Sequence, residues 1–225
     1  IELYQIMTDF IVPFCEQKVT IIYADEDILV VDKPSGLLSV PGKHPLNKDC
    51  LITRVQQQYS DAFIVHRLDM DTSGIMILAR GKANLSALSR QFQERETHKE
   101  YLAWVYGLLK EDAGEIDLPL ICDWPNRPKQ MIDHELGKPS LTRFEVLERQ
   151  AATLQTKVLL KPVTGRSHQL RVHMAQIGHP ISGCDFYAHP QALQQAKRLQ
   201  LHAWKLSFIH PTTGLLMTQT APAVF

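Results

Sequence analysis

The sequence contains no long apolar run and no closely spaced pair of cysteines. No stretch approaches the roughly 20 apolar residues needed to cross a membrane. Residues 1–15 are interrupted by acids and lack a basic start, so they are not typical of a signal peptide. The cysteines are far apart, which argues against a zinc ribbon and favours a reducing compartment. They are Cys15, Cys50, Cys122 and Cys184. We therefore expect a cytoplasmic protein.

Two common classes of binding site are also missing from the sequence. There is no GxGxxG or GxxxxGK[ST] loop, so a nucleotide-binding loop is not predicted. Ten histidines invite a metal hypothesis, but His168 and His173 are five residues apart, which separates them around a helix. No HExxH or paired-cysteine spacing occurs either. The sequence predicts neither a cofactor nor a metal ion.

Acidic residues are nearly missing from the last third of the chain. Residues 149–225 contain eight lysines and arginines but a single acid, Asp185. Residues 1–148 contain 16 basic and 23 acidic residues. The net charge is therefore −7 for residues 1–148 and +7 for residues 149–225, and the two cancel. A polyanion such as nucleic acid would suit the basic segment. The alternative, that these basic groups pair with acids of the first part on the folded surface, remains equally open.

Short β-branched and apolar runs predict strands without a regular βαβ alternation. A chain of 225 residues with 44% hydrophobic content can bury a sizeable core. Such a pattern favours an α+β fold with a mixed, largely antiparallel sheet. The expected strands are 19–23, 28–31, 101–106, 142–147, 157–161 and 201–209.

Apolar residues at helical spacing predict two helices. The first covers 84–95, with Asn84 as its N-cap residue. The second covers 168–177, with Ser167 as N-cap and Gly178 just past its end. Four prolines between 117 and 139 predict a long, ordered loop there instead of a regular element.

Three sets of residues could carry chemistry. The segment 66–74, between two apolar runs, holds Asp69 and more charge than a turn needs. Lys99 lies near Tyr101, and Arg171 lies on the second predicted helix. A guanidinium favours the ionised form of an aspartate, and a tyrosine can stack on a base. Taken singly, each set is better explained without a function, as a turn, a core aromatic residue or a surface cation.

Five segments occur in the order of a known set of motifs. Residues 66–74 read HRLDMDTSG, 32–36 read DKPSG, 99–101 read KEY, 165–173 read GRSHQLRVH and 178–181 read GHPI. Together they resemble the HRLDxxTSG, N/D-KPxG, KxY, GRxHQ[IL]RxH and GHPI motifs of the RluA family of pseudouridine synthases. Relatives usually continue with GHPI-x-GD, whereas the acid comes one residue later here, at Asp185. That departure argues against a role for Asp185.

The resemblance implies the catalytic roles. Asp69 would attack a flipped-out uridine, so that the base detaches, rotates and rejoins through carbon. Arg171 would form an ion pair with Asp69, and Tyr101 would pack against the base and serve in the final deprotonation. Arg67 would enter the vacated stack in the RNA. Asp71 falls at a variable position and is assigned to turn chemistry.

The resemblance also implies the fold and the partners. It predicts a pseudouridine-synthase catalytic domain over 19–225, with an active-site cleft across the sheet, after an N-terminal extension at 1–18 and without an S4-like domain. The run 119–130 is similar to the member that modifies both tRNA and 23S rRNA. We therefore expect the enzyme to modify uridines in a tRNA anticodon loop and a 23S rRNA hairpin loop. We also expect it to be a monomer. The expected RNA-binding residues are Arg67, Arg166, His168, Lys99, Lys129 and Arg127.

Two other functions remain as alternatives. An RNA-binding module of the same fold that has lost catalysis is the first, although it would have no reason to keep Asp69, Tyr101 and Arg171 together. An aspartate-dependent nucleoside hydrolase is the second. It predicts free uracil as a product, whereas an isomerase releases none.

Overall fold

The chain forms two compact units. The computed structural model describes residues 10–223 and 225. The first unit contains the described residues up to Thr97 together with Lys205–Pro222, and the second unit contains His98–Trp204 and the last residues. Of the expected extension at 1–18, residues 1–9 lie outside the described residues. Among the described residues, no helix has the length and apolar character needed to cross a membrane.

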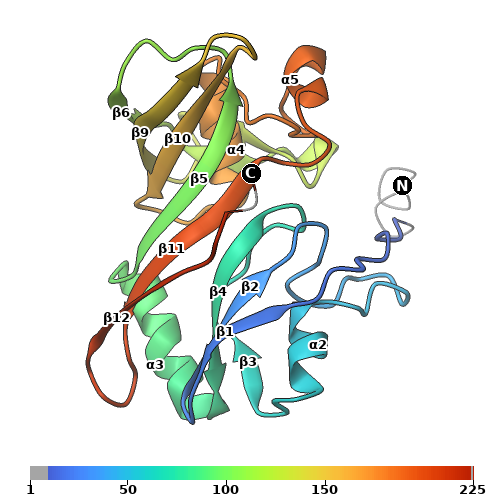
Figure 1. The fold of residues 1–225 in the computed structure, drawn as a ribbon, viewed down its shortest axis with the longest axis vertical. Coiled ribbons are helices and arrows are strands. Elements are labelled where there is room, and N and C mark those ends of the chain that lie inside the picture. Colours follow the sequence, from blue (N-terminus) through green and yellow to red (C-terminus); the bar gives the residue numbers. More distant parts are fainter. Residues whose placement is uncertain (1–9, 224) are drawn as a thin grey trace. The chain divides into compact units, whose positions relative to one another are not determined.

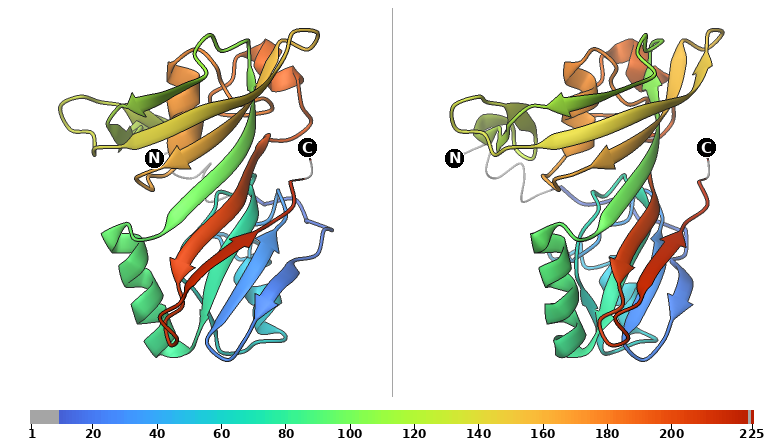
Figure 2. Two further views of the ribbon diagram at one scale, coloured as in Figure 1. Left: turned by 60° about the vertical axis from the view of Figure 1, so that its left-hand side comes forward. Right: turned by 90° about the vertical axis from the view of Figure 1, so that its left-hand side faces the viewer.

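The first unit is organised around a small sheet in which β1 and β2, β2 and β4, β3 and β4, and β11 and β12 are antiparallel pairs (Figure 1). Its strand order is β1-β2-β4-β11, with β3 also paired to β4 and β12 to β11. The paired ends of β11 and β12 run side by side in both views of Figure 2. Their bounds are β1 Thr20–Ala24, β2 Ile28–Lys33, β3 Ala62–Ile64, β4 Ser73–Arg80, β11 Leu201–Ile209 and β12 Leu216–Thr220. The strands expected at 19–23, 28–31 and 201–209 are thus confirmed.

Strands β2 and β4 are the buried centre of the first unit. Residues 28–31 and 76–79 are fully buried, which explains why both strands read as continuous apolar runs. Helices α2 (Leu51–Gln56) and α3 (Gly81–Glu94) both contact β3 (Figure 1). The expected helix at 84–95 is confirmed, but Asn84 is not its N-cap. Helix α3 begins three residues earlier, and the Asn84 side chain donates to Asp27 Oδ1 and to the carbonyl of Arg80 at 2.9 Å each.

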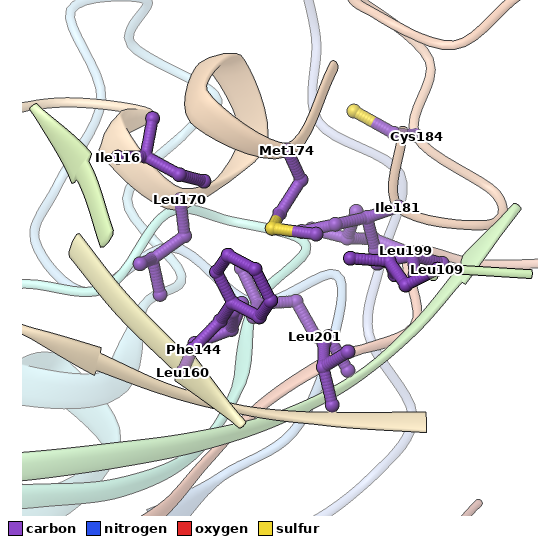
Figure 3. Close-up of a cluster of buried hydrophobic side chains, with 13 residues drawn as sticks. Leu109, Ile116, Phe144, Leu160, Leu170, Met174, Ile181, Cys184, Leu199 and Leu201 are labelled. Carbon is purple, nitrogen blue, oxygen red and sulfur yellow. The ribbon is translucent and has the colours of Figure 1, made fainter. Parts of the chain in front are cut away.

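The second unit is a strongly paired antiparallel sheet with one main helix. Its strand order is β11-β5-β10-β9-β6, and helix α4 contacts β9. In Figure 3, Leu170 and Met174 of α4 point into a core that includes Phe144 and Leu160. The bounds are β5 His98–Tyr106, β6 Ala113–Asp117, β9 Leu141–Gln150, β10 Gln155–Pro162, α4 Gln169–Gln176 and α5 Pro190–Gln194. The strands expected at 101–106, 142–147 and 157–161 are confirmed, as is the α+β class.

The proline-rich segment 117–139 is more regular than expected. A small antiparallel hairpin joins β7 (Leu120–Cys122) and β8 (Gln130–Ile132) through a 3₁₀ turn at Trp124–Asn126. The prediction of a long loop without a regular element is therefore wrong. Its three-residue strands are too short to give a period-2 signal among prolines.

Helix α4 also begins differently from the prediction. Its N-cap residue is His168, in the left-handed conformation at φ 53°, so Ser167 is not the cap. At the other end Gly178 has φ +85° and follows the last turn, as predicted.

A buried polar network holds the segment 164–168 that leads into α4. Gln169 Oε1 accepts from Thr164 Oγ1 at 2.7 Å and from the backbone N–H of Arg166 at 3.0 Å. Gln169 Nε2 donates to the carbonyl of Leu141 and to Thr142 Oγ1, both at 3.0 Å. The amide thus uses both of its donors and its acceptor oxygen, as a buried polar group must. It ties α4 to the start of β9.

His173 extends this network as a neutral imidazole. Nε2 lies 3.0 Å from the carbonyl of Leu118, which can only accept, so Nε2 carries the hydrogen. Nδ1 then accepts from Thr142 Oγ1 at 2.9 Å. Burial lowers the pKa of His173 below its ordinary value, although the Leu118 carbonyl opposes that shift. The role of His173 is therefore structural. Its two hydrogen bonds explain its position without a metal ion.

Stability should therefore depend on pH through His173. An unfolded histidine takes up a proton near pH 6.5, whereas the folded one resists it, so the free energy of unfolding should fall as pH drops below about 6.5. One such group contributes a slope of at most about 1.4 kcal/mol per pH unit. Urea denaturation at pH 7.5 and 5.5 should show a shallower loss for His173→Gln than for the unchanged protein. Equal losses in the two proteins would contradict this assignment.

Candidate active site

Asp69 lies on the irregular segment between β3 and β4, and the backbone of this segment is firmly held. Ser39 Oγ donates to the carbonyl of Leu68 at 2.8 Å, and the Gly36 N–H donates to the carbonyl of Met70 at 2.9 Å. Ser35 Oγ donates to the carbonyl of Asp71 at 2.7 Å. Residues on both sides of Asp69 are therefore tied to the loop that follows β2.

A buried lysine joins the same two loops. Lys33 has no exposed surface, and its Nζ donates to the carbonyls of Pro34, Leu37 and Met70 at 2.7–2.9 Å. Three carbonyls match the three donors of an ammonium group. Lys33 therefore fastens the segment that carries Asp69 to the end of β2.

The charges in this region act on one another. Burial lowers the pKa of Lys33 to about 7, while the carboxylates of Asp71 and Asp69 oppose that shift. The three carbonyl acceptors favour the ammonium form of Lys33, which places a positive charge beside the loop. Lys33 is thus a charged neighbour of the segment 66–74, and the sequence did not reveal this relation.

The two residues before Leu68 have different environments. His66 is half-buried, accepts from the Ile77 N–H through Nε2 at 3.1 Å, and stacks on Phe92 with ring centroids 4.5 Å apart. Arg67 is exposed, whereas Leu68 is buried. The loop therefore anchors His66 and Leu68 inward and presents Arg67 to solvent.

Arg171 lies in the first turns of α4, and its side chain is 2% exposed. Its Nη2 donates to Asp185 Oδ1 at 2.5 Å, and its Nε donates to Cys184 Sγ at 3.3 Å. The guanidinium carbon lies 5.1 Å from the ring centre of Phe186 and 5.4 Å from that of Tyr187. The structure corrects the expectation that Asp185 has no role, because its carboxylate pairs with the predicted catalytic arginine.

His168 joins the same cluster. Its Nδ1 lies 2.6 Å from the hydroxyl of Tyr187, and its ring stacks on Phe186. The Tyr187 hydroxyl also accepts from the backbone N–H of Gln130 at 2.9 Å, so the cluster is linked to β8 of the hairpin. Sequence reasoning missed Tyr187, for which no motif or spacing provides a signal.

The other predicted residues of the second unit lie on β5 and before α4. Tyr101 on β5 packs against the core of this unit. Lys99 Nζ lies 3.7 Å from the place where a side chain on Gly165 would begin, so Lys99 and the segment before α4 are brought together. Arg166 is half-buried and points Nε toward the carbonyl of Pro139 at 3.4 Å.

The hairpin carries a preorganised pair of an aromatic ring and a cation. The guanidinium carbon of Arg127 lies 4.4 Å from the ring centre of Trp124, which is 64% exposed. Lys129 is half-buried at the end of the same turn, where its backbone bonds to Asn126 and Asp123. An exposed tryptophan was not among the predicted RNA-binding residues, although the run 119–130 contains it. Its exposure is a property of the fold that the sequence pattern did not reveal.

One group of side chains within the described residues has the spacing of metal ligands. Ligand atoms of Asp25, Asp27 and His210 lie within 4.8 Å of one another. His210 Nδ1 accepts from the backbone N–H of Thr213 at 3.1 Å, so its Nε2 donates to Asp25 Oδ2 at 3.0 Å. Asp25 Oδ1 meanwhile accepts from two backbone N–H groups. These hydrogen bonds occupy the ligand atoms of His210 and Asp25, so the group carries no metal proposal.

The predicted residues thus fall into two sets. The second unit brings Arg171 and His168 into one cluster, links the hairpin to it, and places Lys99 beside Gly165. Asp69 and Arg67 belong to the first unit. The expected ion pair between Asp69 and Arg171 joins residues of different units and stays a prediction.

Comparison with known proteins identifies the chain. Residues 27–176 match the family model described as RNA pseudouridylate synthase. The protein named dual-specificity RNA pseudouridine synthase RluA is 55% identical over 210 residues in Salmonella typhi, covering 93% of this chain and 95% of that protein. The protein of the same name from Escherichia coli K12 is 54% identical over the same shares of the two chains.

Solved structures agree with the sequence comparison. Human RNA Pseudouridylate Synthase Domain Containing 1 is similar with a TM-score of 0.77 and 31% identity, covering 93% of this chain and 85% of that one. Human RNA Pseudouridylate Synthase Domain Containing 4 shares the fold, with a TM-score of 0.73 and 23% identity, covering 91% and 88% of the two chains. The chain belongs to the RNA pseudouridylate synthase family and is an RNA pseudouridine synthase.

Proposed function

We propose that Asp69 is the nucleophile with which this enzyme converts uridine to pseudouridine. In this isomerisation Asp69 bonds to C1′ of the ribose as the bond between C1′ and N1 breaks, the base rotates, and C5 then displaces Asp69 as it bonds to C1′. C5 then loses its proton and N1 gains one, so no atom is gained or lost. The reaction needs a carboxylate that is ionised and held in place.

The single observation that supports this role best is the anchoring of the Asp69 loop. The carbonyls of Leu68, Met70 and Asp71 all accept hydrogen bonds from the loop after β2 or from Lys33. A turn that only joined two strands would not need side-chain and ammonium donors at three of its carbonyls. Such anchoring suits a loop that must present one carboxylate reproducibly.

The remaining catalytic roles belong to the same proposal. Arg171 keeps Asp69 ionised through a nearby positive charge, and Tyr101 packs against the uracil ring and serves in the last proton transfer. Arg67, exposed on the Asp69 loop, enters the space that the extruded nucleotide leaves. Extrusion is required because a stacked uridine cannot present its glycosidic carbon, and it costs least in a loop.

We further propose that the enzyme acts on two kinds of RNA. The curated relatives named above are called dual-specificity enzymes. A tRNA anticodon loop and a 23S rRNA hairpin loop would share a short sequence and a bent shape, which RNA-binding proteins read in unpaired loops. The residues proposed to contact RNA are Arg67, Lys99, Arg127, Lys129, Arg166 and His168, and we add Trp124.

The cellular setting is also a proposal. Four free cysteines suit the reducing cytoplasm, where tRNA and rRNA are processed. We propose that the enzyme acts there as a monomer.

Replacement of Asp69 tests the reaction directly. Asp69→Asn should abolish pseudouridine formation while leaving the fold and RNA binding nearly unchanged, because the amide keeps the shape but not the nucleophilic charge. Release of tritium from uridine labelled at C5 measures the product. Asp71→Asn is the matched control and should retain activity.

Retained tritium release by Asp69→Asn would rule out Asp69 as the nucleophile. Free uracil released by the unchanged protein would favour the nucleoside hydrolase. RNA binding without tritium release or uracil would favour the inactive RNA-binding module.

Replacement of Trp124 tests the hairpin. Trp124→Ala should weaken binding of an RNA stem-loop by roughly 5- to 160-fold, because stacking of a base on an aromatic ring contributes about 1–3 kcal/mol. Trp124→Phe should retain most of the affinity. Leu136→Ala, which removes another exposed apolar side chain of the same segment, should have no effect on affinity. Equal affinities for Trp124→Ala and Leu136→Ala would contradict stacking.

Dual specificity has its own test. Pseudouridine should disappear from one tRNA anticodon-loop position and from one 23S rRNA hairpin position in a strain that lacks the gene. The Asp69→Asn protein should fail to restore either position, whereas Asp71→Asn should restore both. Full pseudouridine content in both RNAs without the gene would show that the substrates lie elsewhere.

A further inference from the structure

Arg171 is a buried cation that requires a fixed anionic partner. With 2% of its side chain exposed, its guanidinium has lost almost all contact with water. A buried charge is tolerated when it is paired and hydrogen-bonded. Among the contacts described above, the thiol of Cys184 is a weak acceptor, and the rings of Phe186 and Tyr187 provide only their faces. The strong acceptor among them is the carboxylate of Asp185.

Asp185 is unusual both in the sequence and in the structure. It is the one acid among residues 149–225, and it lies 2.5 Å from the arginine that the proposed mechanism uses. Its side chain is 52% exposed, so the carboxylate keeps water on one side while its other side meets Arg171. An exposed acid should repel an RNA phosphate, so its presence in this basic segment needs a compensating reason.

The turn before Asp185 delivers two consecutive residues to Arg171. Gly183 has φ +72°, and a side chain there would begin 2.2 Å from the carbonyl of Arg198. Its N–H donates to Ala192 O at 3.0 Å, and the Cys184 N–H donates to Ile181 O at 3.2 Å. This tight turn places the sulfur of Cys184 against Nε and the carboxylate of Asp185 against Nη2. The acid that follows one residue later than usual thus still reaches the arginine.

We infer that Asp185 is the positioning residue of Arg171: its carboxylate holds the guanidinium in the orientation in which Arg171 serves the proposed reaction. This inference rests on the proposed role of Arg171. Two hydrogen bonds to consecutive residues, at Nε and Nη2, fix the plane of the guanidinium. Without Asp185 the cation keeps its charge but loses this restraint.

Kinetics on an RNA stem-loop separate positioning from RNA binding. Asp185→Ala should lower kcat on the order of 100-fold with little change in KM, because a small displacement of a group that acts on the reacting centre has effects of this size. Asp185→Asn, which keeps an acceptor oxygen, should lose less activity than Asp185→Ala. Asp112→Ala breaks another arginine–aspartate pair of the second unit, Asp112 with Arg149, and should leave kcat unchanged.

A relocated acid provides the decisive rescue. Cys184→Asp combined with Asp185→Ala returns a carboxylate to Arg171 at Nε, because Cys184 Sγ already lies 3.3 Å from this atom. This double variant should regain most of the kcat lost in Asp185→Ala. No rescue, or a lower KM in Asp185→Ala without a fall in kcat, would overturn the inference and leave Asp185 as a charge that merely repels RNA.

A direct observation of Arg171 keeps the inference independent of activity. The Nε–H signal of Arg171 in a ¹⁵N-labelled protein should be sharp and slow to exchange, and Asp185→Ala should broaden or remove it while Asp112→Ala does not. If the unchanged protein forms no pseudouridine, the proposed function fails while this signal still tests the pairing. An Arg171 signal that is unchanged in Asp185→Ala would overturn the inference even in an active enzyme.

Discussion

The Asp69 loop of the first unit and the Arg171 cluster of the second unit each depend on the requirement that a buried cation be surrounded by acceptors. Lys33 and Arg171 head the group of largest fully buried side chains in the described part of the chain. Each donates to groups from segments distant in sequence or from a tight turn. Lys33 donates to carbonyls of two loops, and Arg171 donates to a thiol and a carboxylate. Because an unsatisfied buried charge is so costly, these contacts restrict the positions of the surrounding loops. The chemistry can then rely on a scaffold that is already ordered.

Strands with strong apolar runs were predictable, and so was the segment that carries Asp69. What could not be predicted depends on contacts between distant residues. Asn84 was expected to cap α3, but its amide is used by Asp27 from another turn. Ser167 was expected to cap α4, but the network around Gln169 holds the preceding backbone and His168 takes the cap position. In both cases a local preference was outweighed by tertiary hydrogen bonds, which single-residue patterns do not contain.

The same holds for the candidate site residues: their types could be predicted from motifs, but their contacts could not. Motif resemblance singled out Asp69, Tyr101 and Arg171 by residue type, and it assigned Asp71 to turn chemistry. It assigned no role to Asp185, because the spacing of the motif differs by one residue, although a tight turn at Gly183 removes that difference in space. It also missed Trp124, whose stacking with Arg127 depends on a hairpin within a proline-rich segment. The motifs thus indicate which residue types a site contains, whereas the conformation of the turns determines which side chains come into contact.

The distribution of the two units along the sequence has a consequence for synthesis on the ribosome. The second unit is almost continuous in sequence, whereas the first unit needs residues from both ends of the chain, including the end of β11 and all of β12. The nascent chain therefore carries β2 and β4, with their fully buried apolar residues, through the whole time in which residues 98–204 are added. A protein cut short before β12 would complete most of the second unit but never the first. A truncated chain therefore cannot complete the unit that carries Asp69.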